Sequence, residues 1–284
     1  MKDLGRALVL GGGGVTGIAW EIGMLAGLAD KGLVLSAADL VVGTSAGSVV
    51  GAQIRSGASI EQLYEQQLED ASGEIAARMS PLTILRFIAL SAWPGDPARA
   101  RARTGRAALR ATTVPEGERL RVIESRLPKS EWPAERLLVT AVDAVSGEAK
   151  IFDNQSDTDL VHAVAASCAV PLVWPPITIA GRRYIDGGVR SVANADLAEG
   201  CSRVVVLAPI TATLRRGSGI RDQLAALGPN VRSIVVSPDA ESRRAIGNNV
   251  LDPARRAASA RAGRRQAATV IEAVRSIWSE AAQT

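Results

Sequence analysis

The chain has 284 residues, 33 basic and 29 acidic side chains and a formal net charge of +4, and 47% of its residues are apolar. These values are typical of a globular chain with a sizeable core, and they exclude collagen and disordered proteins. The two cysteines cannot form the disulfide framework of a small secreted protein or a four-ligand zinc site, and the single histidine leaves a Ser-His-Asp triad only one possible base.

The amino-terminal part of the chain alternates between strand and helix patterns. Residues 6–10 form an apolar run that stops at four glycines, 11–14. Residues 17–29 carry apolar side chains at helical spacing, and a second apolar run at 40–42 leads into a glycine-rich turn and a small-residue helix that reaches residue 54. This order of elements predicts an α/β fold with a mainly parallel sheet and helices on its faces.

Residues 57–130 have a different pattern, which we interpret as an inserted helical cap. Helices are expected over 60–68 and 81–92, and Trp93-Pro94-Gly95 breaks the second. A cluster of arginines follows the break: Arg99, Arg101, Arg103, Arg106 and Arg110. An apolar helix beside arginines suits contact with an anionic membrane surface. A packed helix followed by a solvated arginine-rich loop explains the same residues equally well.

The remainder of the chain returns to strand patterns. Two apolar runs, 137–142 and 149–152, flank a turn signal at 145–148 and predict a hairpin. Residues 204–208 and 234–236 are expected to be buried strands. From Arg243 onward the chain is rich in arginine, and we expect a final helix with these residues on its buried face: Val270, Ile271, Val274, Ile277 and Trp278.

The first element suited to chemistry is the glycine loop. Glycines between a strand and a helix let several backbone N–H groups and the helix dipole converge on one point, which favours negative charge. Gly12, Gly14 and Gly17 also fit G-x-G-x-x-G, so a nucleotide-binding module is an alternative. A Rossmann unit would end its second strand with an acidic residue, and here that strand ends at Gly43. No Gly-Lys-Ser/Thr follows the loop, so a P-loop is excluded.

The second element is Gly43-Thr44-Ser45-Ala46-Gly47, a G-x-S-x-G match between a predicted strand and a predicted helix. A serine at such a turn projects its hydroxyl outward, and the flanking glycines relieve crowding. The pentapeptide taken alone is equally an ordinary glycine-rich turn. Its position after a strand and before a helix favours a nucleophile at Ser45.

The third element is Asp186-Gly187-Gly188, which by itself is a turn signal. A serine nucleophile needs a base. His162 lies between Ser45 and Asp186, whereas α/β-hydrolases have the order Ser, acid, His. His162 also belongs to an apolar pattern typical of a packed helix. These observations favour a carboxylate as the base.

With the three elements in this order, the sequence resembles the patatin-like phospholipase family over residues 6–210. The segment 165–171, Ala-Ala-Ser-Cys-Ala-Val-Pro, is similar to the family's Ala-Ser-x-Ala-x-Pro segment. The resemblance implies a three-layer α/β/α fold with a mainly parallel central sheet and a helical cap of about 57–130. It also implies a single domain, 1–284, with a catalytic core at 6–210 and an arginine-rich helical extension at 211–284.

The resemblance also implies roles for individual residues. Ser45 would be the nucleophile and Asp186 the base of a dyad, and the backbone of Gly12, Gly13 and Gly14 would form the oxyanion hole. The glycines that support the motifs are Gly17, Gly43, Gly47, Gly187 and Gly188. The chain departs from the family at Thr16, where Arg or Lys is common, which puts in doubt any role of that cation in holding the loop or attracting anionic head groups.

The function implied is a lipid acyl hydrolase that cleaves carboxylic esters through an acyl-enzyme, of the phospholipase A, lysophospholipase or esterase type. Two alternatives stay open: an acyltransferase that uses the same serine, and a catalytically silent lipid-binding or interaction protein. The substrate would be a lipid or another ester, and neither a cofactor nor a metal is expected.

Partners and location follow from composition. Aromatic residues make up 3% of the chain, too few for a base-stacking platform, so no nucleic-acid partner is expected. The amino terminus lacks a hydrophobic stretch typical of a signal peptide. Residues 160–181 carry no acidic or basic side chain, but prolines at 171, 175 and 176 argue against a transmembrane helix. We expect a cytoplasmic protein, with contact at a membrane surface as the alternative already given for the cap. The sequence does not indicate an oligomeric state.

Overall fold

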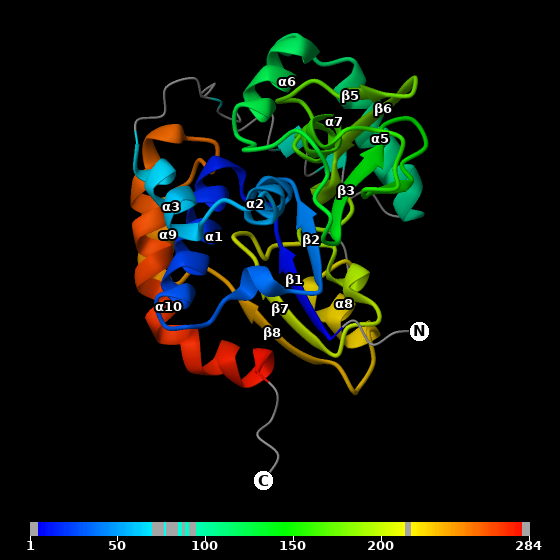
Figure 1. Ribbon diagram of the computed structural model, residues 1–284. Helices are drawn as coiled ribbons and strands as arrows, with labels where there is room; N and C mark the ends of the chain where they lie inside the picture. The colour runs from blue at the N-terminus through cyan, green and yellow to red at the C-terminus, as the bar shows by residue number, and fades with distance from the viewer. Residues whose placement is uncertain are drawn as a thin grey trace.

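A mostly parallel sheet organises the chain in the computed structural model, which describes residues 5–69, 77, 85–86, 89–90, 95–213 and 217–279 (Figure 1). The sheet has eight strands in the order β5-β6-β3-β2-β1-β7-β8, and β4 pairs with β3. The strands are β1 (Arg6–Leu10), β2 (Leu40–Thr44), β3 (Leu137–Asp143), β4 (Ala149–Phe152), β5 (Ile177–Ile179), β6 (Arg182–Asp186), β7 (Arg203–Leu207) and β8 (Arg232–Val236). The α-helices are α1 (Gly14–Ala29), α2 (Ala46–Arg55), α3 (Ile60–Leu68), α5 (Pro97–Leu109), α6 (Glu116–Glu124), α7 (Leu160–Ser167), α8 (Ile220–Ala226), α9 (Ala240–Ile246) and α10 (Arg256–Trp278).

Parallel pairing brings the two glycine-rich turns to one edge of the sheet. Strands β1 and β2 are parallel, with Ala7 opposite Leu40 and Leu10 opposite Gly43. Their sequences are almost continuously apolar because helices cover both faces of the sheet. The carboxyl ends of parallel strands meet at the same edge. The glycine loop after β1 and the turn after β2 therefore lie side by side.

An antiparallel strand delivers Asp186 to the same region. Strand β3 is parallel to β2, with Thr140 opposite Thr44, and β6 is antiparallel to β3, with Asp186 opposite Ala141. The hairpin expected around 145–148 is present between β3 and β4. Asp186 is thus two strands away from the end of β2, although Thr44 and Asp186 are 142 positions apart in the sequence.

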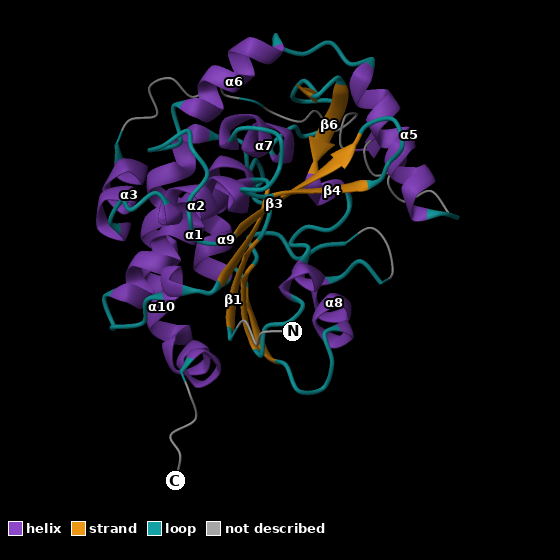
Figure 2. Ribbon diagram, turned by 45° about the vertical axis from the view of Figure 1, so that its right-hand side comes forward, coloured by secondary structure: helices purple, strands orange, loops and turns teal. Residues whose placement is uncertain are grey.

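Helices form a layer on each face of the sheet, so the predicted three-layer α/β/α class is confirmed (Figures 1 and 2). The larger layer contains α1, α2, α3, α7 and α10 and shares its apolar core with one set of alternate strand residues. The other set packs against α8 and the short helix η3 (Ala195–Ala198). No helix in the described part of the chain is both long and apolar enough to cross a membrane.

The segment expected to be a cap contributes to several parts of the molecule. Helix α3 packs against α1 and α10, α5 packs against β3 and β6, and α6 packs against α7. Apart from 85–86 and 89–90, the helix expected over 81–92 lies outside the described residues. The cap as a structural unit stays a prediction.

The carboxyl-terminal segment, expected to be an arginine-rich helical extension at 211–284, packs against the core. Strand β8 pairs in parallel with β7, and α10 packs along α1. Of the stripe expected in the last helix, Val274 and Trp278 are buried, and Val270, Ile271 and Ile277 are partly buried against the same core. The stripe predicted from the sequence therefore faces the core, while the packing of α10 along α1 has no local sequence signal.

Small residues allow α1 and α10 to approach very closely. A Cβ built on Gly23 would lie 2.0 Å from the carbonyl oxygen of Ala260, and one on Gly263 would lie 2.3 Å from that of Trp20. Arg264 of α10 also pairs with Asp30 at 2.9 Å and with Glu61 at 2.9 Å. The first helix is therefore held along its length by α10, a segment distant in sequence.

We predict that Gly23→Ala lowers the free energy of unfolding by about 1–3 kcal/mol, because the added methyl group must push two helix backbones apart. Urea denaturation of the purified protein measures this. Gly117→Ala is the matched control, since no described atom beyond its neighbours and its own helix backbone lies within 4 Å of the Cβ position, and it should be neutral or slightly stabilising. Equal stability of the two variants would contradict the close α1–α10 contact.

Candidate active site

Ser45 occupies a tight turn between β2 and α2 with an unusual backbone conformation. Its φ is 51° and its ψ is −115°, a region that side chains other than glycine rarely enter. A Cβ on Gly47 would lie 2.1 Å from the Leu10 carbonyl oxygen, and one on Gly43 would lie 2.6 Å from the Gly47 carbonyl oxygen. The two glycines let α2 start directly against the end of β1, which places Ser45 at the helix amino terminus as the motif predicts.

The segment after α7 fixes both Ser45 and Asp186. The Ser45 amide donates to Ser167 Oγ at 2.9 Å, and Cys168 Sγ donates to the Ser45 carbonyl oxygen at 3.3 Å. The Asp186 amide donates to the carbonyl oxygen of Ala169 at 3.0 Å. Three consecutive residues therefore set the relative position of the two groups. The similarity of this segment to the family indicates no role for its side chains, so these contacts are apparent only in the folded chain.

The Asp186 carboxyl is buried beside Ser45. Its Oδ1 accepts from the Gly188 amide at 2.7 Å. Burial raises its pKa to about 6, while the Ser45 hydroxyl, the Gly188 amide and the positive charge of Arg119 act in the opposite direction. Oδ2 is buried and, among the described atoms, has no partner with full hydrogen-bond geometry. The Ser45 hydroxyl is close enough to lower the pKa of the carboxyl, although burial outweighs this effect.

His162 is engaged elsewhere. Its Nδ1 lies 2.7 Å from Asp159 Oδ2 at the exposed start of α7. It is absent from the residues described as lining the pocket around Ser45. The placement of the single histidine agrees with a carboxylate as the base.

The glycine loop offers fewer backbone donors than the sequence suggested. The Gly12 amide donates to the Val192 carbonyl oxygen at 2.7 Å, so it is already used. Within the described residues, the amides of Gly13 and Gly14 have no hydrogen-bond partner, and they lie at the amino terminus of α1. This narrows the expected oxyanion donors from three glycines to two.

The remaining motif glycines support these turns. Gly17 lies in the first turn of α1, where its amide donates to the Gly13 carbonyl oxygen at 2.8 Å. Gly187 and Gly188 begin the short helix η2 (Gly187–Val189) that follows Asp186.

Thr16, where the family commonly has a cation, has a structural role. Its amide and its Oγ1 both donate to the Val250 carbonyl oxygen, at 3.2 Å each. The neighbouring residue Leu251 lines the pocket over Ser45. Thr16 therefore ties the glycine loop to the segment that precedes α10.

A small pocket opens above the Ser45 hydroxyl. Its wall is mostly apolar, with two arginines, and the lining residues are Gly14, Val15, Ile18, Ser45, Ala46, Arg119, Arg126, Cys168, Val170, Trp174 and Leu251. The described residues contain no group of three His, Cys, Asp or Glu side chains that could hold a metal ion. The arrangement of hydroxyl, buried carboxyl and unused amides is suited to nucleophilic attack on a carbonyl carbon.

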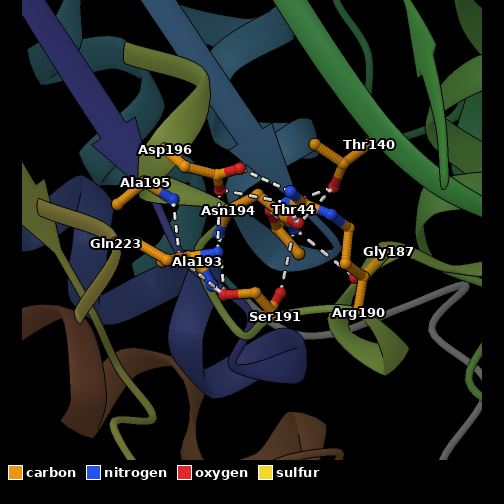
Figure 3. A network of polar contacts seen from close by, with 10 residues as sticks. All are labelled: Thr44, Thr140, Gly187, Arg190, Ser191, Ala193, Asn194, Ala195, Asp196 and Gln223. Carbon is orange, nitrogen blue, oxygen red and sulfur yellow. Dashed lines mark hydrogen bonds and ion pairs between the residues drawn. The ribbon is translucent and has the colours of Figure 1, made fainter. Parts of the chain in front are cut away.

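A buried polar network links Thr44, the residue before Ser45, to the loop after Asp186 (Figure 3). Asn194, with a left-handed backbone at φ 52°, donates to Thr44 Oγ1 at 2.9 Å and to Thr140 Oγ1 at 3.2 Å. Its Oδ1 accepts from Arg190, which also pairs with Asp196. The network joins β2, β3 and the loop after Asp186. Sequence reasoning missed Asn194, because no local pattern reveals partners 54 and 150 residues away.

The chain was compared with known protein families, curated proteins and solved structures. The model of the patatin-like phospholipase family matches residues 8–199. No curated protein matches the chain. Among solved structures, the chain is similar to VipD from Legionella pneumophila, with a TM-score of 0.47 and 15% identity over 95% of this chain and 67% of that one. It is also similar to the type III effector protein ExoU, with a TM-score of 0.42 and 16% identity over 96% of this chain and 53% of that one.

We predict that Asp186→Asn stabilises the fold at pH 8 by up to about 3 kcal/mol, because it removes a charge whose burial raises the pKa from 3.8 to about 6. Below pH 4 the carboxyl is protonated in the folded and unfolded states and the two proteins should differ little. Between pH 4 and 6 the unfolded state ionises first, so the native protein loses stability relative to the variant. Urea unfolding of both proteins from pH 4 to 8 measures the difference in their free energies of unfolding. If the advantage of the variant over the native protein does not grow from pH 4 to pH 8, the raised pKa is contradicted.

Proposed function

The chain belongs to the patatin-like phospholipase family, and from this premise we propose that it is a serine lipid acyl hydrolase whose Ser45–Asp186 dyad cleaves carboxylic esters. Members of the family act on lipid substrates. The observation that carries the proposal is the juxtaposition of Ser45, on its strained turn, with a buried carboxyl whose pKa is raised to about 6. An ordinary aspartate is too weak a base for this reaction, and burial supplies the missing basicity.

In the first step, Asp186 accepts the hydroxyl proton while Ser45 Oγ attacks the ester carbonyl carbon. The carbonyl oxygen gains negative charge and is held by the Gly13 and Gly14 amides at the positive end of α1. In other enzymes one such donor is worth about 3–4 kcal/mol in the transition state. The tetrahedral intermediate then expels the alcohol, which takes the proton from Asp186, and leaves an acyl-enzyme.

In the second step, Asp186 accepts a proton from a water molecule that attacks the acyl-enzyme. The fatty acid leaves and the proton returns to Ser45 Oγ. An alcohol in place of water would give acyl transfer, so products formed with added glycerol distinguish a hydrolase from an acyltransferase. A silent lipid-binding protein is disfavoured because the strained serine, the buried carboxyl and the unused amides are all present.

We predict that Ser45→Ala and Asp186→Asn each lower kcat for 4-nitrophenyl octanoate by about 10³-fold or more, because each removes one half of the dyad. A fluorophosphonate probe should label Ser45 in the native protein and leave Ser45→Ala unlabelled, as peptide mass spectrometry would show. His162→Ala is the control and should retain activity, since its ring contacts Asp159. Activity retained by Asp186→Asn, or lost in His162→Ala, would contradict the dyad.

We predict that kcat/KM rises with pH through a single ionisation near 6, because only the deprotonated Asp186 accepts the Ser45 proton. Well below that pH, activity should fall about tenfold for each pH unit. A rate profile from pH 4.5 to 8.5 with a water-soluble ester measures this. Activity that is flat down to pH 4.5 would show that the base has the pKa of an ordinary aspartate.

A further inference from the structure

Helix α1 carries a fully buried carboxyl, Glu21, that the proposed reaction does not use. Its Oε1 accepts from the Gly11 amide at 3.0 Å, whereas its Oε2 is buried and has no hydrogen-bond partner among the described atoms. Burial raises the pKa of this carboxyl well above its ordinary value, and the Gly11 amide acts in the opposite direction. Within the described residues no cation offsets the burial. Such a group destabilises the folded chain.

The backbone at Gly11 does not need this hydrogen bond for its own satisfaction. The Gly11 amide also donates to the Leu207 carbonyl oxygen at 2.9 Å, which continues the pairing of β1 with β7. A backbone amide has a single hydrogen to donate, so one acceptor is sufficient. An apolar side chain in place of Glu21 would leave no unpaired group at Gly11 and would remove the buried Oε2. The cost of burying Glu21 is therefore not returned as stability, which points to a role in the site.

The Gly11 peptide joins the two glycine-rich turns of the site. Its carbonyl oxygen accepts from the Gly47 amide at 3.0 Å, in the turn that follows β2. On its other side the chain enters the loop with the unused amides of Gly13 and Gly14. Side chains of a helix lean toward its amino terminus, so Glu21 reaches back from α1 to the point where this loop leaves β1.

We infer that Glu21 is a positioning residue, whose hydrogen bond orients the Gly11 peptide and thereby directs the Gly13 and Gly14 amides at the ester carbonyl oxygen. This inference rests on the proposed function, since it concerns the oxyanion donors of the same reaction. Donors fixed in advance stabilise the charge that develops in the transition state, and a small displacement lowers the rate. Glu21 is absent from the residues described as lining the pocket, so its loss should affect kcat rather than KM.

Two substitutions at this position separate positioning from structural support. Glu21→Gln keeps an uncharged oxygen acceptor for the Gly11 amide, and its kcat for 4-nitrophenyl octanoate should stay within about twofold of the native value. Glu21→Met has a similar volume but no such acceptor, and should lower kcat by about tenfold at an unchanged KM. Its urea midpoint should equal or exceed the native one, because the buried unpaired oxygen is gone.

A core substitution and a transition-state analogue complete the test. Ile22→Val alters the next residue of α1, which is buried and does not line the pocket. It should unfold at a lower urea concentration and keep the native kcat, the reverse of Glu21→Met. The ketone 1,1,1-trifluorodecan-2-one adds reversibly to a serine hydroxyl and leaves an oxyanion. Its affinity should fall in Glu21→Met by the same factor as kcat/KM.

Three outcomes would overturn the inference. They are full activity in Glu21→Met, a Glu21→Gln protein as slow as Glu21→Met, and a Glu21→Met protein that is both slower and less stable than the native one, as a purely structural role requires.

Hydrogen exchange keeps the inference testable if the native protein cleaves no ester, an outcome that would count against the proposed function alone. Mass spectrometry of the peptide that covers residues 11–17 measures the protection of the loop amides. The Gly11 and Gly12 amides should exchange about fivefold faster in Glu21→Met than in the native protein, and at the native rate in Glu21→Gln. Equal exchange in all three proteins would overturn the positioning role.

Discussion

The close approach of α2 to the end of β1 is the constraint on which the site depends. Ser45 adopts a backbone conformation that costs about 1–3 kcal/mol, and it persists only where the surroundings over-determine it. Here Gly47 lies directly against Leu10, and Ser167 and Cys168 hold the amide and carbonyl of the serine. These contacts with β1, α2 and the segment after α7 fix the backbone of Ser45, and its hydroxyl therefore faces the pocket.

The site combines a carboxyl whose burial destabilises the folded chain with a hydrogen-bond network that stabilises it. Burial of the Asp186 carboxyl gives it the basicity the reaction needs and disfavours its charged form in the folded chain. The Asn194 network beneath it satisfies buried hydroxyl and carbonyl groups of β2, β3 and the following loop. A polar network of this kind is costly when one member is missing. The surrounding structure therefore holds the Asp186 carboxyl in its buried position even though burial disfavours its charged form.

Local sequence signals predicted what depends on neighbours in the chain, and missed what depends on tertiary contact. The turn at Ser45, the turn after Asp186 and the α/β order follow from glycine positions and apolar runs, so they could be read in advance. The docking of α10 depends on Gly23 meeting Ala260, and the use of the Gly12 amide depends on Val192. Neither contact has a signal in the local sequence. The sequence likewise does not indicate that Arg119 and Arg126 line the pocket, because only folding brings α6 and the turn after it next to Ser45.

The pocket is assembled from segments that lie far apart in the sequence. Its wall includes Val15 and Ile18 of α1 together with Leu251, and Thr16 donates to the Val250 carbonyl oxygen just before α10. Helix α10 then covers the glycine-rich side of α1. The pocket is therefore complete only when the segment before α10 has docked on the glycine loop, 234 residues away in the sequence. Its formation depends on the tertiary fold rather than on the turns that carry Ser45 and Asp186.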